Sequence, residues 1–236
     1  MLNEANTKPI VVIGDVHGLT NWKDVVKRHR GSMFVFLGDY CDPYEDIEPD
    51  ALIKNFRSIV LFKKKHPKDV ILLLGNHDMH YISEDIVTST RYDNRMASRM
   101  KRIIYNNRDL FQYAWQYGNM LFTHAGVNDQ WFHEDFIGSL DGKRSVAEQL
   151  NHPTPEQFSA MGQVSWLRGG PNENGGIFWA DKYETSQNPL KGYIQFVGHS
   201  RVNNIKQVKL DENTSITYCD CLFNNQYLVI NRQNMN

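Results

Sequence analysis

The sequence of 236 residues lacks any apolar run long enough to cross a membrane. Its first ten residues, MLNEANTKPI, lack the basic segment and the apolar stretch of a secretion signal. Cysteine is scarce, and Cys41, Cys219 and Cys221 are too few and odd in number to give a disulfide framework. These absences predict a cytoplasmic protein with no membrane partner, in which the cysteines are small apolar residues.

The sequence also lacks an excess of positive charge, because it contains 26 Lys and Arg residues and 27 Asp and Glu residues, for a net charge of -1. Proteins that hold polyanions carry a basic surface, so we expect no stable nucleic-acid binding. A near-neutral chain can still take a small phosphorylated substrate if bound metals meet its charge. No repeat, low-complexity tract or linker divides the sequence, and residues 1–236 are predicted to form a single domain.

The first third of the chain contains three short apolar runs, each of which stops at glycine followed by polar residues. The runs are Pro9–Gly14, Met33–Leu37 and Val70–Leu74, and they end at GDVHG, GDYCD and GNHD. Trp22–His29 and Pro49–Lys65, which separate them, have apolar residues at helical spacing. This alternation predicts a βαβαβ arrangement with buried, parallel strands.

The second half is more antiparallel in character. Two β-like runs on either side of Gly118-Asn119 are expected to form a hairpin, Phe111–Tyr117 with Met120–Thr123. Four further β-like runs alternate with turns: Ile194–Val197, Ile205–Leu210, Ser215–Tyr218 and Gln226–Ile230.

Chemically active side chains follow five of the predicted strands. In open α/β sheets the ligand crevice lies beyond the carboxyl ends of the strands, so these side chains are expected at one edge. They are Asp15, His17, Asp39, Asp42, Asn76, His77, His124 and His199.

Such a cluster has the wrong chemistry for a core, because buried carboxylates and imidazoles need partners and few Lys or Arg residues are close in sequence. Divalent cations would supply the charge. Oxygen and imidazole donors without thiolates suit manganese, iron or zinc. Asp39 could give an oxygen to each of two ions, and a pair about 3.5–4 Å apart is the arrangement used for in-line phosphoryl displacement.

The ordered blocks GDVHG, GDYCD, GNHD, THAG and GHS resemble those of the calcineurin-like metallophosphoesterase superfamily. The similarity is greatest to the serine/threonine protein phosphatase-like branch, which includes phage and bacterial phosphatases. One such block alone is weak evidence for the family, but five blocks in this order, each after a predicted strand, are strong evidence. The resemblance implies an α/β fold of four layers, an α-β-β-α sandwich of two packed mixed sheets flanked by helices.

The resemblance also implies a role for each matching residue. His77 would be the general acid, oriented by Asp42, and a metal-bridging hydroxide would be the nucleophile. Asp39 would bridge two divalent ions, with manganese favoured in vitro and iron or zinc as alternatives. The remaining ligands would be Asp15 and His17 for the first ion, and Asn76, His124 and His199 for the second.

Two phosphate-binding arginines are missing: Pro43 occupies the place of one found in the protein phosphatases of the resembled family, and Leu74 the place of one found in some phage and bacterial members. This departure weighs against phosphoprotein specificity. Arg168 and Arg201 are the candidates to replace them as substrate-binding residues. A basic cluster surrounds the predicted helix at Arg95–Ile104, and a solvated helical face is favoured for it over a substrate-facing surface. Its members are Arg91, Arg95, Arg99, Lys101, Arg102 and Arg108.

The sequence therefore predicts a dimetal phosphomonoesterase of the serine/threonine phosphatase type, acting on a phosphoprotein or a small phosphoester. A dinucleoside polyphosphate hydrolase or phosphodiesterase would use the same ions, and the flanking loops would decide between them. A catalytically silent scaffold of the same fold is the non-enzyme alternative, although such a protein would be expected to lose ligands that are all present here.

Overall fold

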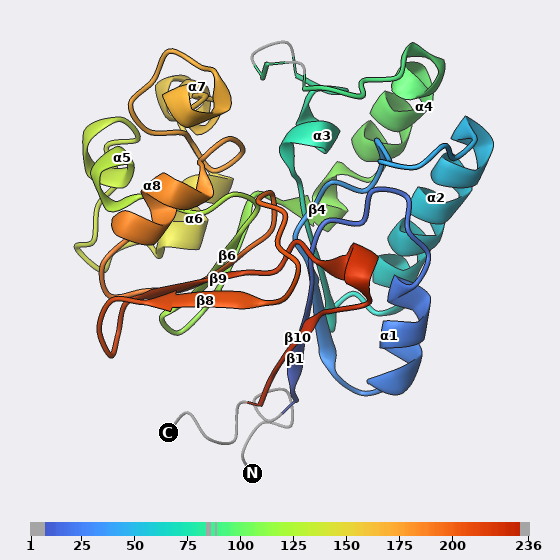
Figure 1. Cartoon of the computed structure of the whole chain (residues 1–236), viewed down its shortest axis with the longest axis horizontal. Helices are drawn as coiled ribbons and strands as arrows, with labels where there is room; N and C mark the ends of the chain where they lie inside the picture. The colour runs from blue at the N-terminus through green and yellow to red at the C-terminus, as the bar shows by residue number, and fades with distance from the viewer. Residues whose placement is uncertain (1–7, 84–85, 88, 232–236) are drawn as a thin grey trace.

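Two five-stranded sheets, flanked by helices, make up the computed structural model, which describes residues 8–83, 86–87 and 89–231 (Figure 1). Sheet A has the order β10-β1-β2-β3-β4, and sheet B has the order β5-β6-β7-β9-β8. The predicted four-layer α-β-β-α sandwich is confirmed. Among the residues described, none of the helices has the length and apolar character needed to cross a membrane.

Sheet A carries the first three predicted strands. Its members β1 to β4 run parallel, and β10 pairs antiparallel with β1. All four residues of β1, β2 and β3 are buried, as expected for parallel strands that are covered on both faces. The strands are β1 (Ile10–Ile13), β2 (Met33–Phe36), β3 (Val70–Leu73), β4 (Phe111–Gln112) and β10 (Leu228–Ile230).

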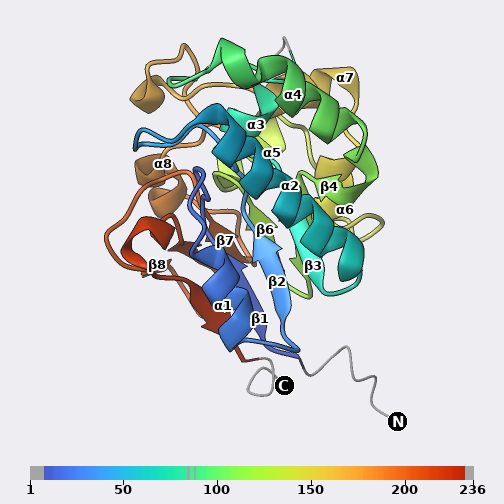
Figure 2. The same ribbon diagram turned by 90° about the vertical axis from the view of Figure 1, so that its right-hand side faces the viewer.

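Helices α1 and α2 cover the outer face of sheet A, where Figure 2 shows them lying across β1, β2 and β3, and α4 packs beside α2. Both predicted helices of this region are confirmed. Proline at the first position of α2 suits a helix start, because its missing N–H would be unpaired there anyway. The helices are α1 (Trp22–Arg28), α2 (Pro49–Lys65), the short α3 (Asn76–Met79) and α4 (Asn94–Tyr105).

Sheet B is mixed rather than mainly antiparallel. The β6, β7 and β9 strands run parallel, while β5 and β8 pair antiparallel at the two edges. Four short helices lie beside this sheet in Figure 1: α5 (Asp129–Glu134), α6 (Val146–Asn151), α7 (Pro155–Met161) and α8 (Lys182–Gln187). The strands are β5 (Ala114–Tyr117), β6 (Met120–Thr123), β7 (Ile194–Val197), β8 (Lys206–Lys209) and β9 (Ser215–Tyr218).

The predicted hairpin around Gly118 is present as β5 and β6, but its first run is divided between the sheets. The β4 strand pairs with β3 in sheet A, and the chain crosses to sheet B at Tyr113. Asn151 Oδ1 accepts hydrogen bonds from the backbone N–H groups of Tyr113 (2.8 Å) and Ala114 (3.1 Å) at the crossing. A side chain from α6 thus replaces the ladder partners that the chain gives up there.

Apolar side chains from both sheets meet in one layer, which fixes how the strand ends of sheet A face those of sheet B. Alternate residues of β1 and β2 point into it, and Phe122 and Phe196 enter it from sheet B. The rings of Phe122 and Phe196 stack with centroids 4.8 Å apart. Because this layer joins the two sheets, its packing positions the candidate site.

Phe122→Ala should destabilise the fold by about 3–5 kcal/mol, since it removes a fully buried ring from this layer and leaves a cavity. Urea unfolding measures the change. Leu61→Ala is the control, because Leu61 on α2 is 63% exposed and its truncation should change the free energy of unfolding by less than about 0.5 kcal/mol. Equal effects of the two substitutions would contradict this description of the core.

Candidate metal centre

The polar residues that follow β1, β2, β3, β6 and β7 converge beyond the carboxyl ends of these strands. Each of the six predicted metal ligands is buried except His199, which is partly buried. Within the described residues, two groups of ligand atoms share Asp39, and a third group, Asp42, His77 and His80, lies beside them. Of the two that share Asp39, one is Asp15, His17 and Asp39, and the other is Asp39, His124 and His199.

The second group has Asn76 at its middle. Asn76 Oδ1 lies 2.9 Å from His124 Nε2 and 3.0 Å from His199 Nδ1, and these two nitrogens are 3.2 Å apart. Asp39 Oδ2 lies 3.5 Å from His124 Nε2. Two imidazole nitrogens, one amide oxygen and one carboxylate oxygen thus face a common point, as the ligands of one cation must.

The first group is joined to the second through the same oxygen of Asp39. His17 Nε2 lies 3.7 Å from Asp39 Oδ2 and 3.8 Å from Asp15 Oδ2. The other oxygen, Asp39 Oδ1, accepts a hydrogen bond of 2.9 Å from the backbone N–H of His77. The carboxylate is therefore fixed in orientation, with Oδ2 turned toward both groups.

Backbone carbonyls set the tautomers of two histidines. His17 Nδ1 lies 3.0 Å from the carbonyl oxygen of Cys41, and His124 Nδ1 lies 2.8 Å from that of Leu37. Because a carbonyl can only accept, Nδ1 carries the proton in each ring and Nε2 presents its lone pair to the centre. This is the arrangement of a metal-binding histidine held by a partner behind it.

The backbone around the centre is unusual, since His17, Asp39, Asp42 and His199 have positive φ angles of 42°, 51°, 55° and 58°. Residues other than glycine rarely adopt this left-handed backbone conformation, and strained residues of this kind are common at functional sites. Two glycines leave the space that the ligands fill: a Cβ at Gly75 would lie 2.2 Å from Asp39 Oδ1, and one at Gly198 would lie 2.0 Å from Asp15 Oδ1.

Burial dominates the electrostatics of the centre. It raises the pKa of Asp15 and of Asp39 well above the usual value, and the neighbouring carboxylates Asp220 and Asp78 add to the effect. Burial also lowers the pKa of His17 and of His124 to about 3. Among the described residues no Lys or Arg forms a salt bridge with Asp15 or Asp39, so divalent cations fit the missing charge.

Asp78, the last letter of GNHD, supports the centre without entering it. Its carboxylate accepts hydrogen bonds from the backbone N–H groups of Asp39 (2.7 Å), Tyr40 (3.0 Å) and Gly75 (2.9 Å). Burial raises the pKa of Asp78 to about 7. No role was inferred for this residue from the sequence, although a carboxylate beside two predicted site residues was the available signal.

The predicted catalytic pair lies together at the edge of the centre. His77 Nδ1 is 2.8 Å from Asp42 Oδ2, and the ring of His77 lies edge-on to that of His17 with centroids 5.3 Å apart. His80 Nε2 is also 2.8 Å from Asp42 Oδ2, and Tyr81 donates a hydrogen bond to Oδ1. Burial opposes ionisation, but the hydrogen bonds from His77, His80 and Tyr81 lower the pKa of Asp42.

The two predicted substrate arginines lie near the centre in different settings. Arg168 Nη2 donates to Ser200 Oγ at 2.6 Å, and its Nε lies 2.8 Å from Asp181 Oδ2. The guanidinium of Arg201 lies over the rings of Tyr44 and Phe223, with its Cζ 4.3 and 3.7 Å from their centroids. The guanidinium of Arg168 is thus bound to Ser200 and Asp181, whereas that of Arg201 packs against two aromatic rings.

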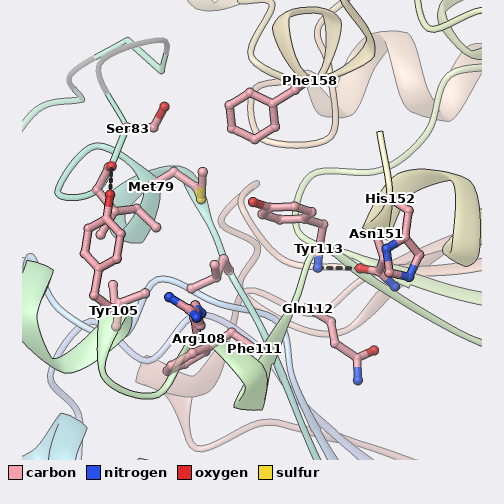
Figure 3. Close-up of a pocket in the computed structure, with 13 residues that line it drawn as sticks. Met79, Ser83, Tyr105, Arg108, Phe111, Gln112, Tyr113, Asn151, His152 and Phe158 are labelled. Atoms are coloured by element: carbon pink, nitrogen blue, oxygen red, sulfur yellow. Dashed lines mark hydrogen bonds between the residues drawn. The ribbon is translucent and has the colours of Figure 1, made fainter. Parts of the chain in front are cut away.

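A cavity of about 670 Å³ lies away from the predicted ligands (Figure 3). Met79, Tyr105, Arg108, Tyr113 and Phe158 are among the side chains that surround it. Leu74, which stands where some phage and bacterial members of the resembled family have an arginine, is buried and lines this cavity. No predicted ligand, and neither His77 nor Asp42, borders it.

The sandwich, together with Asp, His and Asn side chains gathered at its strand ends, defines the class of metallo-dependent phosphatase folds. Within that class, the chain belongs to the calcineurin-like phosphoesterases, whose family model matches residues 8–226. The resemblance read from the five sequence blocks is therefore confirmed at the level of the family.

Curated relatives carry phosphatase names. The chain is 24% identical over 140 residues to the serine/threonine-protein phosphatase 4 catalytic subunit of Kluyveromyces lactis, a match that covers 56% of this chain and 41% of that protein. It is 28% identical over 149 residues to the PP2A-like serine/threonine-protein phosphatase PPG1 of Candida albicans, covering 58% and 34%. The chain thus spans less than half of the length of these relatives.

A cold-active protein-tyrosine phosphatase of a Shewanella species shares the fold with a TM-score of 0.55 and 14% identity, over 97% of this chain and 80% of that chain. A protein serine/threonine phosphatase of Saccharomyces cerevisiae gives a TM-score of 0.53 at 16% identity, over 92% and 68%. At such identities the likeness establishes the fold alone.

Manganese should stabilise the protein more at pH 8 than at pH 5.5. Without cations, the raised pKa of Asp15 and Asp39 keeps protons on groups that must lose them to bind metal, so affinity rises with pH. His17 and His124, with pKa values of about 3, stay neutral throughout. A metal at 100 times its dissociation constant adds about 2.7 kcal/mol, which thermal unfolding can detect.

Asp39→Asn should remove most of this stabilisation, whereas Asp24→Asn on the exposed side of α1 should keep it. A stabilisation by manganese that is equal at both pH values, or that survives in Asp39→Asn, would count against the carboxylates as ligands.

Proposed function

We propose that this chain hydrolyses phosphomonoesters with two divalent cations bound at the centre, in the manner of the serine/threonine phosphatase-like branch. The ligands are Asp15 and His17 for one ion, Asn76, His124 and His199 for the other, and Asp39 for both. Manganese is the metal proposed for assays in vitro, with iron or zinc as alternatives. When bound, such ions neutralise phosphoryl oxygens and lower the pKa of water to about 7.

One observation carries the proposal: an imidazole that is not needed as a ligand lies beside the two ligand groups, held by a carboxylate. His77 donates from Nδ1 to Asp42, which leaves Nε2 on the opposite side of the ring. Because the departing alkoxide of a phosphate ester needs a proton, His77 is proposed to deliver it from Nε2. Burial lowers the pKa of His77 overall, and Asp42, oriented by His80 and Tyr81, opposes that shift by favouring the charged ring and fixes its orientation.

The relatives named above are serine/threonine phosphatases, and one solved structure of the same fold is a tyrosine phosphatase. We therefore propose a phosphoprotein or a small phosphoester as the substrate. The cytoplasmic location stays a prediction. Hydrolysis of dinucleoside polyphosphates or phosphodiesters remains the second candidate, because it would use the same ions.

The experiment that tests the function compares four substrates with the manganese-loaded chain. They are an aryl phosphate, its bis-ester, a dinucleoside polyphosphate, and a set of peptides phosphorylated on Ser, Thr or Tyr. The proposal predicts a higher kcat/KM for the monoesters than for the bis-ester and the dinucleotide. A preference for either of the latter two would replace it by the second candidate.

His77→Asn should leave the metal content unchanged while slowing esters of poorly acidic alcohols by about 10²–10⁴-fold. Esters of acidic phenols should suffer less, because their leaving groups depart without a proton. His133→Asn, a change of an exposed histidine on α5, is the control and should alter neither. The measurement is the ratio of mutant to parent rates across phosphate esters of graded leaving-group pKa.

A ratio that is flat across the series would remove the acid role from His77. Loss of metal would instead make His77 a ligand, and the acid would then have to be sought elsewhere.

A further inference from the structure

Pro43 stands where the protein phosphatases of the resembled family have an arginine, and the next residue, Tyr44, gathers two guanidinium groups from other segments. Arg91 Cζ lies 3.9 Å from the centroid of the Tyr44 ring, and Arg201 Cζ lies 4.3 Å from it. Phe223 lies on Arg201 at 3.7 Å. We call Tyr44, Arg91, Arg201 and Phe223 the Tyr44 stack.

The Tyr44 stack stands at the mouth of the metal centre. Tyr44 is 48% exposed, and its ring meets the ring of His17 edge-on with centroids 5.0 Å apart. A narrow crevice beside the stack is lined by Tyr44, Arg201 and Phe223 together with Asp15 and His17. Any ester bound to ions at Asp15 and His17 would therefore lie against the stack.

Arg91 is also fixed to the proposed catalytic pair. Its Nε donates to the backbone carbonyl of Asp42 at 3.1 Å, and its Nη2 donates to His77 Nε2 at 3.2 Å. This second bond must break before Nε2 can carry the proton for the leaving group, as it would when Arg91 turns to a bound phosphate. Arg91 has a positive φ of 65°, the same strained conformation as four of the site residues. The solvated helical face that was favoured for the basic cluster is therefore wrong for this member, because Arg91 precedes α4 and turns toward the centre.

We propose that Arg91 binds the non-bridging phosphoryl oxygens of the substrate, with Tyr44 holding its guanidinium at the mouth of the centre and Arg201 adding a second positive charge there. This inference rests on the proposed function, and it names the substrate as a phosphomonoester dianion. A guanidinium pairs with phosphate through two parallel N–H groups, which neither Pro43 nor the buried Leu74 can supply. A monoester carries one more negative charge than a diester, so it gains more from the two arginines.

The test uses Arg91→Ala and Arg91→Lys in the manganese-loaded chain. Loss of a charge-assisted pair should weaken the binding of inorganic phosphate, measured by calorimetry, and raise KM for an aryl phosphate by about 10–150-fold. KM for the bis-ester should change less. Lysine should restore only part of the loss, because it cannot pair through two parallel N–H groups.

Arg95→Ala is the matched control, since Arg95 is 70% exposed, pairs with Asp93 and should leave phosphate affinity unchanged. Unchanged phosphate affinity in Arg91→Ala, with an active parent, would overturn the role of Arg91 while the proposed function stands. Loss of manganese from Arg91→Ala would assign the residue to the support of Asp42 and also overturn it. A parent that binds no phosphate would overturn both proposals.

Discussion

Buried carboxyl groups that have no Lys or Arg partner within the described part of the chain are the constraint on which the rest of this structure depends. Asp15 and Asp39 lie under the surface, facing each other and His17, in surroundings that raise the pKa of both carboxyls. Burying carboxylates costs solvation free energy, and bound divalent cations compensate for that cost most directly. The strained φ angles at His17, Asp39 and His199 follow from the same demand, because the ligands must turn back sharply after their strands.

The framework around the centre is built so that this charge stays in place. Asp78 ties the block after β2 to the block after β3 through three backbone N–H groups, and Asp39 itself accepts from the N–H of His77. The layer of Phe122 and Phe196 joins the two sheets, so ligands from β6 and β7 meet those from β1 to β3. Burial that costs stability in the free chain therefore becomes binding energy once cations are present.

Much of the fold and of the candidate site can be predicted from the sequence, since short apolar strands and the glycines that follow them are local signals. The ranges of β1, β2, β3 and α2 follow directly from the apolar pattern, and so does the convergence of the residues after them. The crossing at Tyr113 was not accessible, because Asn151, which satisfies the backbone there, lies 38 residues away. Arg91 was misassigned for a similar reason: a left-handed turn, invisible to periodicity, directs it to His77.

The central claim is that two cations share the carboxylate of Asp39, and anomalous diffraction from manganese-loaded crystals tests it most directly. The account predicts two anomalous peaks about 3.5–4 Å apart, one on each side of Asp39. One would be bound by Asp15 and His17, and the other by Asn76, His124 and His199. A single peak, or a peak among Asp42, His77 and His80 instead, would contradict the account.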